Sequence, residues 1–135
     1  MVNEEQIKDT VSEIMYMFSH NYLSALEATF DKNEVYGNNY SIGKISDDAI
    51  CLVNDGNSWE VLYSERGHEE ILSSHDNILD ACKYMIEEMS ENDVMVQKMT
   101  SDFHSILSTS ENMDTSSTSK LKSLISKFAS SVAMI

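Results

Sequence analysis

The sequence predicts an α+β fold: a long N-terminal helix, an antiparallel sheet of about four strands, and then two to three helices that pack on the sheet. Apolar residues recur every three or four positions at both ends of the chain, which is typical of amphipathic helices. All four glycines lie between positions 37 and 67, where turns are needed to reverse strands. With 135 residues, of which 41% are hydrophobic, the chain is long enough for one domain with a buried core.

The first element is one helix from Asn3 to about Phe30, because apolar residues recur through this segment at helical spacing. They are Ile7, Val11, Ile14, Met15, Phe18, Tyr22, Ala25 and Leu26. Asn3, with Gln6 three residues later, fits a capping box. Glu4 and Glu5 lie where the helix dipole favours negative charge. The sequence therefore specifies the start of this helix well.

The glycine-containing middle of the chain is the predicted sheet. We expect strands at residues 40–45, 49–53, 58–64 and 68–72. The segment from Asn54 to Asn57, Asn-Asp-Gly-Asn, is a hairpin signal, and Arg66-Gly67 predicts a tight turn. In the third strand Trp59, Val61 and Tyr63 share one face by the strand period of two. We expect that face to meet the helices.

Two further helices are expected after the sheet. Ile78, Cys82, Met85, Ile86 and Met89 make one apolar stripe, and Met95, Met99, Phe103, Ile106 and Leu107 make another. The second of these helices should begin after Asn92-Asp93. The methionines on these stripes are interpreted as core filler, because their spacing is helical.

The last part of the chain differs in composition, so the predicted domain is 1–107, followed by a Ser/Thr-rich linker at 108–119. Residues 120–135 are expected to form a basic amphipathic helix. Its apolar stripe is Leu121, Leu124, Ile125, Phe128 and Val132. Three interpretations of this helix stay open: docking on the acidic body of its own chain, which we expect, dimerisation, or binding to a membrane surface.

The charge balance limits the kinds of partner that this chain can bind. The chain has 23 acidic and 9 basic residues and a net charge of −14, which repels nucleic acid and attracts basic partners. We therefore expect no direct nucleic-acid binding. The first residues have no basic segment followed by an apolar run, and no stretch approaches membrane-spanning length. A cytoplasmic protein that does not use a membrane is expected.

Catalytic chemistry has little support in the residues. Cys51 and Cys82 fit buried free thiols better than a disulfide, a zinc site or a nucleophile. His68, Glu70 and His75 lie close in sequence, but they lack the paired spacing of metal ligands. We therefore expect no catalytic residues, no metal and no cofactor, and the hypothesis of an enzyme or metal-binding protein remains only as an alternative.

Acidic residues concentrate on the predicted sheet loops and on the helix after the sheet. The candidate partner-binding residues are Asp47, Asp48, Asp55, Glu60, Glu65, Glu69, Glu70, Glu87, Glu88 and Glu91. Scattered surface charge usually serves only solubility. A concentrated acidic face beside exposed aromatics such as Tyr36 and Tyr40, however, favours fast capture of a basic protein.

The run Trp59-Glu60-Val61-Leu62-Tyr63-Ser64-Glu65-Arg66-Gly67, followed by a strand and by Asp80-Ala81-Cys82-Lys83-Tyr84-Met85, resembles small bacterial immunity proteins. These proteins neutralise polymorphic or contact-dependent toxins. The resemblance implies a non-enzymatic inhibitor that binds a cognate toxin domain, often a nuclease, by occluding its active site or substrate cleft. Trp59, Tyr63, Arg66 and Gly67 are then assigned to the fold. The segment after Ser108 has no counterpart in the resemblance.

Two other functions remain open beside this one. An acidic inhibitor that imitates nucleic acid to block a host or phage defence enzyme would share the charge but not the resemblance. A non-catalytic adaptor subunit would pack its helices on a partner without inhibiting it. A monomer is expected over a homodimer, although the first and the last helix each offer an apolar stripe for a dimer.

Overall fold

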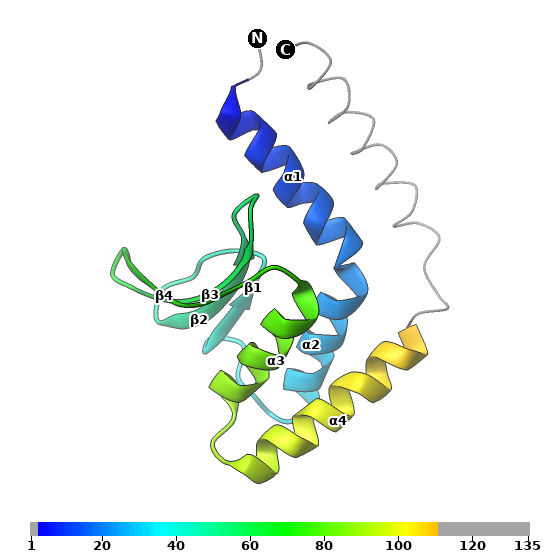
Figure 1. Cartoon of the computed structure of the whole chain (residues 1–135). Coiled ribbons are helices and arrows are strands. Elements are labelled where there is room, and N and C mark those ends of the chain that lie inside the picture. The colour runs from blue at the N-terminus through cyan, green and yellow to red at the C-terminus, as the bar shows by residue number, and fades with distance from the viewer. Residues whose placement is uncertain (1–2, 111–135) are drawn as a thin grey trace.

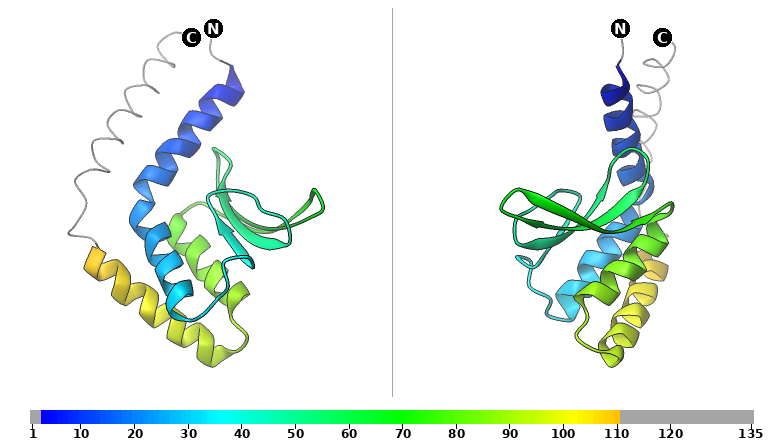
Figure 2. Two further views of the ribbon diagram at one scale, coloured as in Figure 1. Left: turned by 180° about the vertical axis from the view of Figure 1, so that it is seen from behind. Right: turned by 60° about the vertical axis from the view of Figure 1, so that its left-hand side comes forward.

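A computed structural model describes residues 3–110 of the chain (Figure 1). The elements in order are α1 (Glu4–Phe18), α2 (His20–Lys32), β1 (Tyr40–Ile42), β2 (Ala49–Asn54), β3 (Trp59–Glu65), β4 (His68–His75), α3 (Ile78–Met89) and α4 (Asp93–Ser110). The helices gather on one side of a single four-stranded sheet, so the predicted α+β class is confirmed (Figures 1 and 2).

The sheet is mixed, and the prediction of a purely antiparallel sheet was wrong. Its strands follow the order β1-β2-β3-β4, in which β1 is parallel to β2 and the other two pairs are antiparallel. The short segment 43–48 returns the chain to the end of the sheet where β1 began. Gly43 (φ 90°) and Asp48 (φ 57°) make this path possible with backbone angles in the left-handed region.

The two predicted hairpin turns are confirmed. Asp55 holds the β2–β3 turn, because its carboxylate accepts the backbone N–H of Asn57 and of Ser58, each at 2.8 Å. Arg66 and Gly67 both have positive φ angles, as a two-residue turn between twisted strands requires. In β4 the pairing shifts between Ser73 and Ile71, and the strand continues to His75, three residues beyond the predicted end.

The predicted single helix from Asn3 to about Phe30 is in fact two helices. The capping box at Asn3 is present, but α1 ends at Phe18 and α2 begins at His20. Ser19 between them is buried and leaves helical geometry, with φ −100° and ψ 7°. The chain bends here because α2 packs in the core, with Leu26 and Phe30 fully buried, whereas α1 has no buried residue and extends beyond the sheet (Figure 2).

The main core lies between the helices and one face of the sheet, which we call the inner face. Trp59 and Val61 on β3 are fully buried there, as the strand period predicted, and so is Leu52 on β2. Tyr63, the third residue predicted to meet the helices, is only half-buried and is not part of this core, so that part of the prediction was wrong. The helices contribute Leu26 and Phe30 from α2 and, in a further group, Ala81, Cys82, Met85, Ile86, Met99, Phe103 and Leu107 from α3 and α4. The two predicted stripes after the sheet are therefore confirmed as core.

The α1 helix is attached to the β2–β3 hairpin by polar bonds. Asn54 donates its backbone N–H to the Tyr16 hydroxyl at 2.8 Å and accepts the Ser12 hydroxyl on its carbonyl at 2.8 Å. Gly56 approaches α1 so closely that an added Cβ would lie 2.8 Å from the Lys8 carbonyl oxygen. The Tyr16 ring also contacts Trp59 edge to face, with 5.3 Å between the ring centroids.

A polar cluster ties the end of α2 to α4. The Asp102 carboxylate accepts hydrogen bonds from Asn33 at 3.0 Å, from Lys98 at 3.0 Å and from Lys32 at 3.3 Å. These three donors lower the pKa of Asp102 to about 2, with Asn33 as the main cause. α4 continues to Ser110, so the first three residues of the predicted linker are helical. The rest of that linker and the predicted basic helix lie outside the described residues.

A candidate partner-binding face

The second face of the sheet, which we call the outer face, faces away from the helices (Figure 2). It carries Cys51, Val53, Glu60, Leu62, Ser64, Glu69 and Ile71. Only a thin layer covers its centre, because Ser46, in the segment that joins β1 to β2, lies against the Cys51 sulfur at 3.4 Å. A small second cluster of Ala49, Cys51 and Leu62 is buried beneath this segment.

Exposed apolar side chains also lie on the outer face. Ile71 is paired with the buried Leu62 across β3 and β4 and is 58% exposed. Ile45, in the segment that crosses the outer face, is 49% exposed. Neither residue was singled out from the sequence, although Ile71 shares a face with Glu69 by the strand period. The outer face therefore combines exposed apolar surface with carboxylates.

Five of the predicted partner-binding residues gather where the β3–β4 turn and the start of β2 meet. These turn-end carboxylates are Asp47, Asp48, Glu65, Glu69 and Glu70, and all five are exposed. Asp47 reaches Ser64 at 3.3 Å, and the backbone N–H of Asp48 donates to the carbonyl of the same serine at 2.7 Å. Ser64 is in turn paired with Glu69 across the sheet. The fold therefore brings these carboxylates together from β3, from β4 and from the segment that precedes β2.

Glu60 and Asp55 extend the negative surface toward the other end of β3. Burial raises the pKa of Glu60, and the carboxylates of Asp55 and Glu69 raise it further. The pKa of Asp55 is lowered despite its partial burial, because Ser58 and Asn57 donate to it. Asp55 therefore stabilises the hairpin turn through these hydrogen bonds. The ionised form of Glu60, in contrast, is disfavoured by burial and by the neighbouring negative charges. A cation placed beside Glu60 would relieve that cost.

The remaining three predicted residues lie elsewhere. Glu87 and Glu88 are exposed on α3, and Glu91 follows in the connection to α4. α3 packs against the inner face of the sheet, so its exposed side and the outer face point away from the same core. The ten predicted residues therefore form two separate groups, seven around the sheet and three around the end of α3.

The two aromatic residues expected to be exposed also behave differently. Tyr36 is 73% exposed and lies between α2 and β1. Tyr40 is only 8% exposed, so that prediction was wrong. Its ring packs on Phe30 with 4.8 Å between the centroids, because β1 turns this side chain toward α2. Burial and the nearby Asp31 and Glu27 raise the pKa of the Tyr40 hydroxyl.

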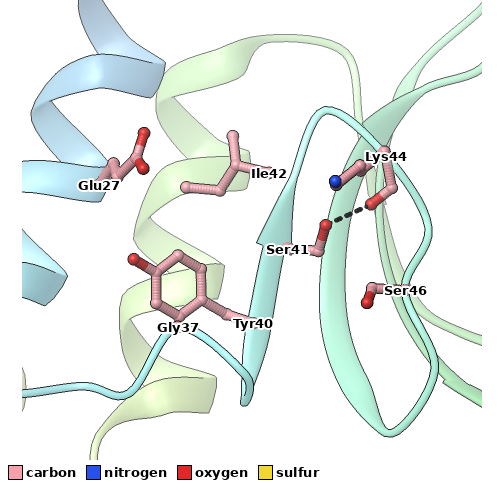
Figure 3. A pocket seen from close by; sticks show the side chains of 7 residues that line it. All are labelled: Glu27, Gly37, Tyr40, Ser41, Ile42, Lys44 and Ser46. Atoms are coloured by element: carbon pink, nitrogen blue, oxygen red, sulfur yellow. Dashed lines mark hydrogen bonds between the residues drawn. The ribbon is translucent and has the colours of Figure 1, made fainter.

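Two open hollows adjoin the sheet. One of 180 Å³ lies among the turn-end carboxylates and is lined by Tyr63, Glu65, His68, Glu69 and Glu70. The other, of 310 Å³, lies at the free edge of β1, with Glu27 and Tyr40 on the helix side and Lys44 and Ser46 on the opposite side (Figure 3). In it the Ser41 hydroxyl donates to the Lys44 carbonyl at 2.7 Å. Neither set of lining residues pairs a nucleophile with a base.

The residues weighed for chemistry are dispersed. His68 and His75 lie at opposite ends of β4, and within residues 3–110 no three His, Cys, Asp or Glu side chains gather as metal ligands would. Cys51 and Cys82 are buried free thiols. Burial raises the pKa of Cys82 to about 12, and burial also raises that of Cys51. In the same part of the chain, no helix has the length and apolar character needed to cross a membrane.

Comparisons of the chain with protein-family models, with curated proteins and with solved structures find no match.

Proposed function

We propose that this chain is an immunity protein that binds a cognate bacterial toxin domain and blocks it without catalysis. The partner is a basic protein, and a nuclease is the class that best fits, because a nuclease needs a cationic cleft for phosphates. The contact surface is the outer face, with Glu60, Glu69 and Asp47 among its carboxylates. Binding there covers the cleft of the toxin or the approach to it.

The observation that carries the proposal is the combination, on the outer face, of exposed apolar residues with carboxylates. Ile71 and Ile45 are exposed on the same side of the sheet as Glu60 and Glu69, and no helix within residues 3–110 covers that side. Tight interfaces commonly have an apolar centre and a polar rim. A uniformly charged surface that served solubility alone would not need exposed isoleucines among its carboxylates.

Electrostatics favours a cationic partner on this face. The pKa of Glu60 is raised by burial and by the neighbouring carboxylates, so its ionised form is disfavoured in the free protein. An arginine or lysine of the partner would lower that pKa again, and the relief adds to the binding free energy. The net charge of −14 would also steer a basic partner toward the chain and raise the association rate.

An inhibitory role without catalysis agrees with the state of the reactive groups. Cys82 and Cys51 are buried thiols with raised pKa values, which does not suit a nucleophile. We propose that neither takes part in chemistry.

The test is capture of the partner followed by a toxicity assay. Tagged full-length protein is used to retain its partner from the native cell at low and at high salt, and the partner is identified by mass. The captured domain is then expressed alone and together with this chain. We expect it to be basic, to arrest growth when alone, and to be neutralised by co-expression, with capture weakened by salt.

Two variants of equal charge then separate the faces. Glu60→Lys with Glu69→Lys reverses charge on the outer face, whereas Glu87→Lys with Glu88→Lys makes the same charge change on α3. We expect the outer-face variant to lose about 100-fold or more in affinity and to lose protection, and the α3 variant to lose less than about tenfold. Equal losses would reject the outer face as the contact surface. Capture of an assembly with no toxic member would reject the immunity function itself.

A further inference from the structure

The α1 helix presents apolar residues that the core does not use. We call Ile7, Val11, Ile14 and Phe18 the α1 stripe, since their spacing places them along one side of the helix. Phe18 is 59% exposed, and no residue of α1 is buried. Within the described part of the chain, α1 packs Met15 and Tyr16 against the core, but none of the α1 stripe.

The hairpin does not cover the α1 stripe either. Ser12 and Tyr16 bond to Asn54, and the Lys8 backbone lies against Gly56, so the side of α1 that carries Lys8, Ser12 and Tyr16 faces the hairpin. At about 100° per residue, Ile14 lies about 160° around the helix from Ser12 and also about 160° from Tyr16, on the side opposite to both. The α1 stripe, in which Phe18 is exposed and Ile7, Val11 and Ile14 are half-buried, is therefore available for a further contact.

The chain carries a segment with the matching pattern beyond Ser110. From its sequence, residues 120–135 are expected to be an amphipathic helix with Leu121, Leu124, Ile125, Phe128 and Val132 on one side. From Leu121 to Val132 such a helix extends about 16 Å, the same length as from Ile7 to Phe18. The two stripes therefore match in length.

The charges of the two segments are opposite. α1 carries Glu4, Glu5, Asp9 and Glu13 against Lys8, a balance of −3. Residues 115–135 carry Lys120, Lys122 and Lys127 and no acidic residue, a balance of +3. Attraction between them is expected at low and moderate salt.

The path of the chain also permits the contact. Asp102 on α4 reaches Lys32 at the end of α2, and α4 runs from there toward the side of the molecule where α1 and α2 meet (Figures 1 and 2). Residues 111–119 can extend at most about 30 Å, which gives the chain room to reverse its direction after Ser110.

We propose that residues 120–135 of the same chain pack antiparallel on the α1 stripe. Leu121 then lies near Phe18, Ile125 near Ile14, and Val132 near Ile7. A second copy of the chain is the weaker occupant, because pairing two α1 helices brings together two segments of charge −3. The contact does not depend on the proposed toxin partner.

Disulfide trapping in the full-length protein tests the contact directly. Ile14→Cys combined with Ile125→Cys is compared with Glu13→Cys combined with Ile125→Cys, in which the α1 cysteine lies about 100° around the helix. We expect the first pair to oxidise at least about tenfold faster, within one chain, while the buried Cys51 and Cys82 stay reduced. Equal rates for both pairs, or a product of twice the chain mass, would overturn the proposal, and the latter would point to a second copy.

Hydrogen exchange supplies a readout without new cysteines. Phe128→Asp places a charge in the predicted stripe, and Ser130→Asp places the same charge on the opposite side of the same helix. We expect Phe128→Asp to speed exchange of the α1 amides by about tenfold or more, and Ser130→Asp to change it by less than about twofold. Unchanged exchange in β3 and α4 shows that the body stays folded. Equal effects of both variants on α1 would contradict the proposal.

Discussion

The inner and outer faces of the sheet are built from the same strands, yet they differ in what covers them. Leu52 and Leu62 illustrate the contrast, since both are buried, at 0% and 4% exposure, on neighbouring strands. Leu52 points into a core shared with the helices. Leu62 points into a cluster of three buried residues, next to the 58% exposed Ile71. One face is buried in the core, and the other keeps apolar and charged side chains exposed.

The difference shows that exposure within a strand reflects the layer above it as much as the residue itself. Glu60 and Glu69 lie on the outer face, which no helix of the described residues covers, and burial and neighbouring carboxylates raise the pKa of Glu60 there. If Val61, on the inner face, were replaced by a residue with a carboxylate, that group would lie among fully buried apolar side chains. The loss of its hydration would lower the free energy of unfolding by roughly several kcal/mol. The carboxylates that repel one another therefore lie on the face that is accessible from outside the protein.

The largest expected effect compares the two leucines. Leu52→Ala should lower the free energy of unfolding by about 4 kcal/mol, because the cavity it leaves is enclosed by helices and sheet. Leu62→Ala should cost about 2 kcal/mol, because the covering segment can settle into the space or admit water. Urea denaturation of both variants measures the difference. Equal costs would mean that the outer cluster is as rigidly packed as the main core.

A smaller effect is expected at Asp102, which joins the helices behind the inner face. Asp102→Asn should cost about 1 kcal/mol at pH 7, since hydrogen bonds to a charged acceptor are replaced by weaker ones. The folded pKa is about 2 against an ordinary 3.8, so this stability is present above pH 3.8 and is lost as the pH falls toward 2. Denaturation curves at several pH values measure it.

The control for Asp102 is Glu91→Gln, which removes one negative charge from an exposed position. It should leave the acid dependence of unfolding unchanged. If the Asp102 variant and the wild type lost stability in parallel below pH 3.8, the carboxylate would not be the cause of the acid sensitivity in that range.

The smallest effect, of opposite sign, is expected on the outer face. The folded pKa of Glu60 is raised above the ordinary 4.5, so its ionisation opposes folding, and stability rises as the pH falls through the folded value. Glu60→Gln should therefore stabilise the free protein by a few tenths of a kcal/mol at pH 7, with no gain at pH 3. A loss of stability in the variant would show that the carboxylate makes a favourable bond in the folded protein.

The site could be predicted from the sequence in its parts but not in its grouping. The residue types and the turn signals predicted an acidic surface at Asp47, Glu65 and Glu69. The strand period predicted that Trp59 lies on the buried side. That period could not tell that Glu87, on α3, belongs to a different side of the molecule, because this depends on which face α3 covers. It could not find Ile71 as an exposed residue for the same reason.

Local signals determined the elements of this protein. The capping box at Asn3, the hairpin turn at Asp55 and the stripes of α3 and α4 all act over a few residues, so they can be recognised along the chain. The break at Ser19, the burial of Tyr40 and the parallel pairing of β1 with β2 were decided only by tertiary structure. No glycine or proline marks Ser19, and the helix ends there because α2 must reach the core while α1 follows the hairpin. These three features depend on contacts between residues that are far apart in the chain. The free energy of such contacts cannot be read from a local sequence pattern.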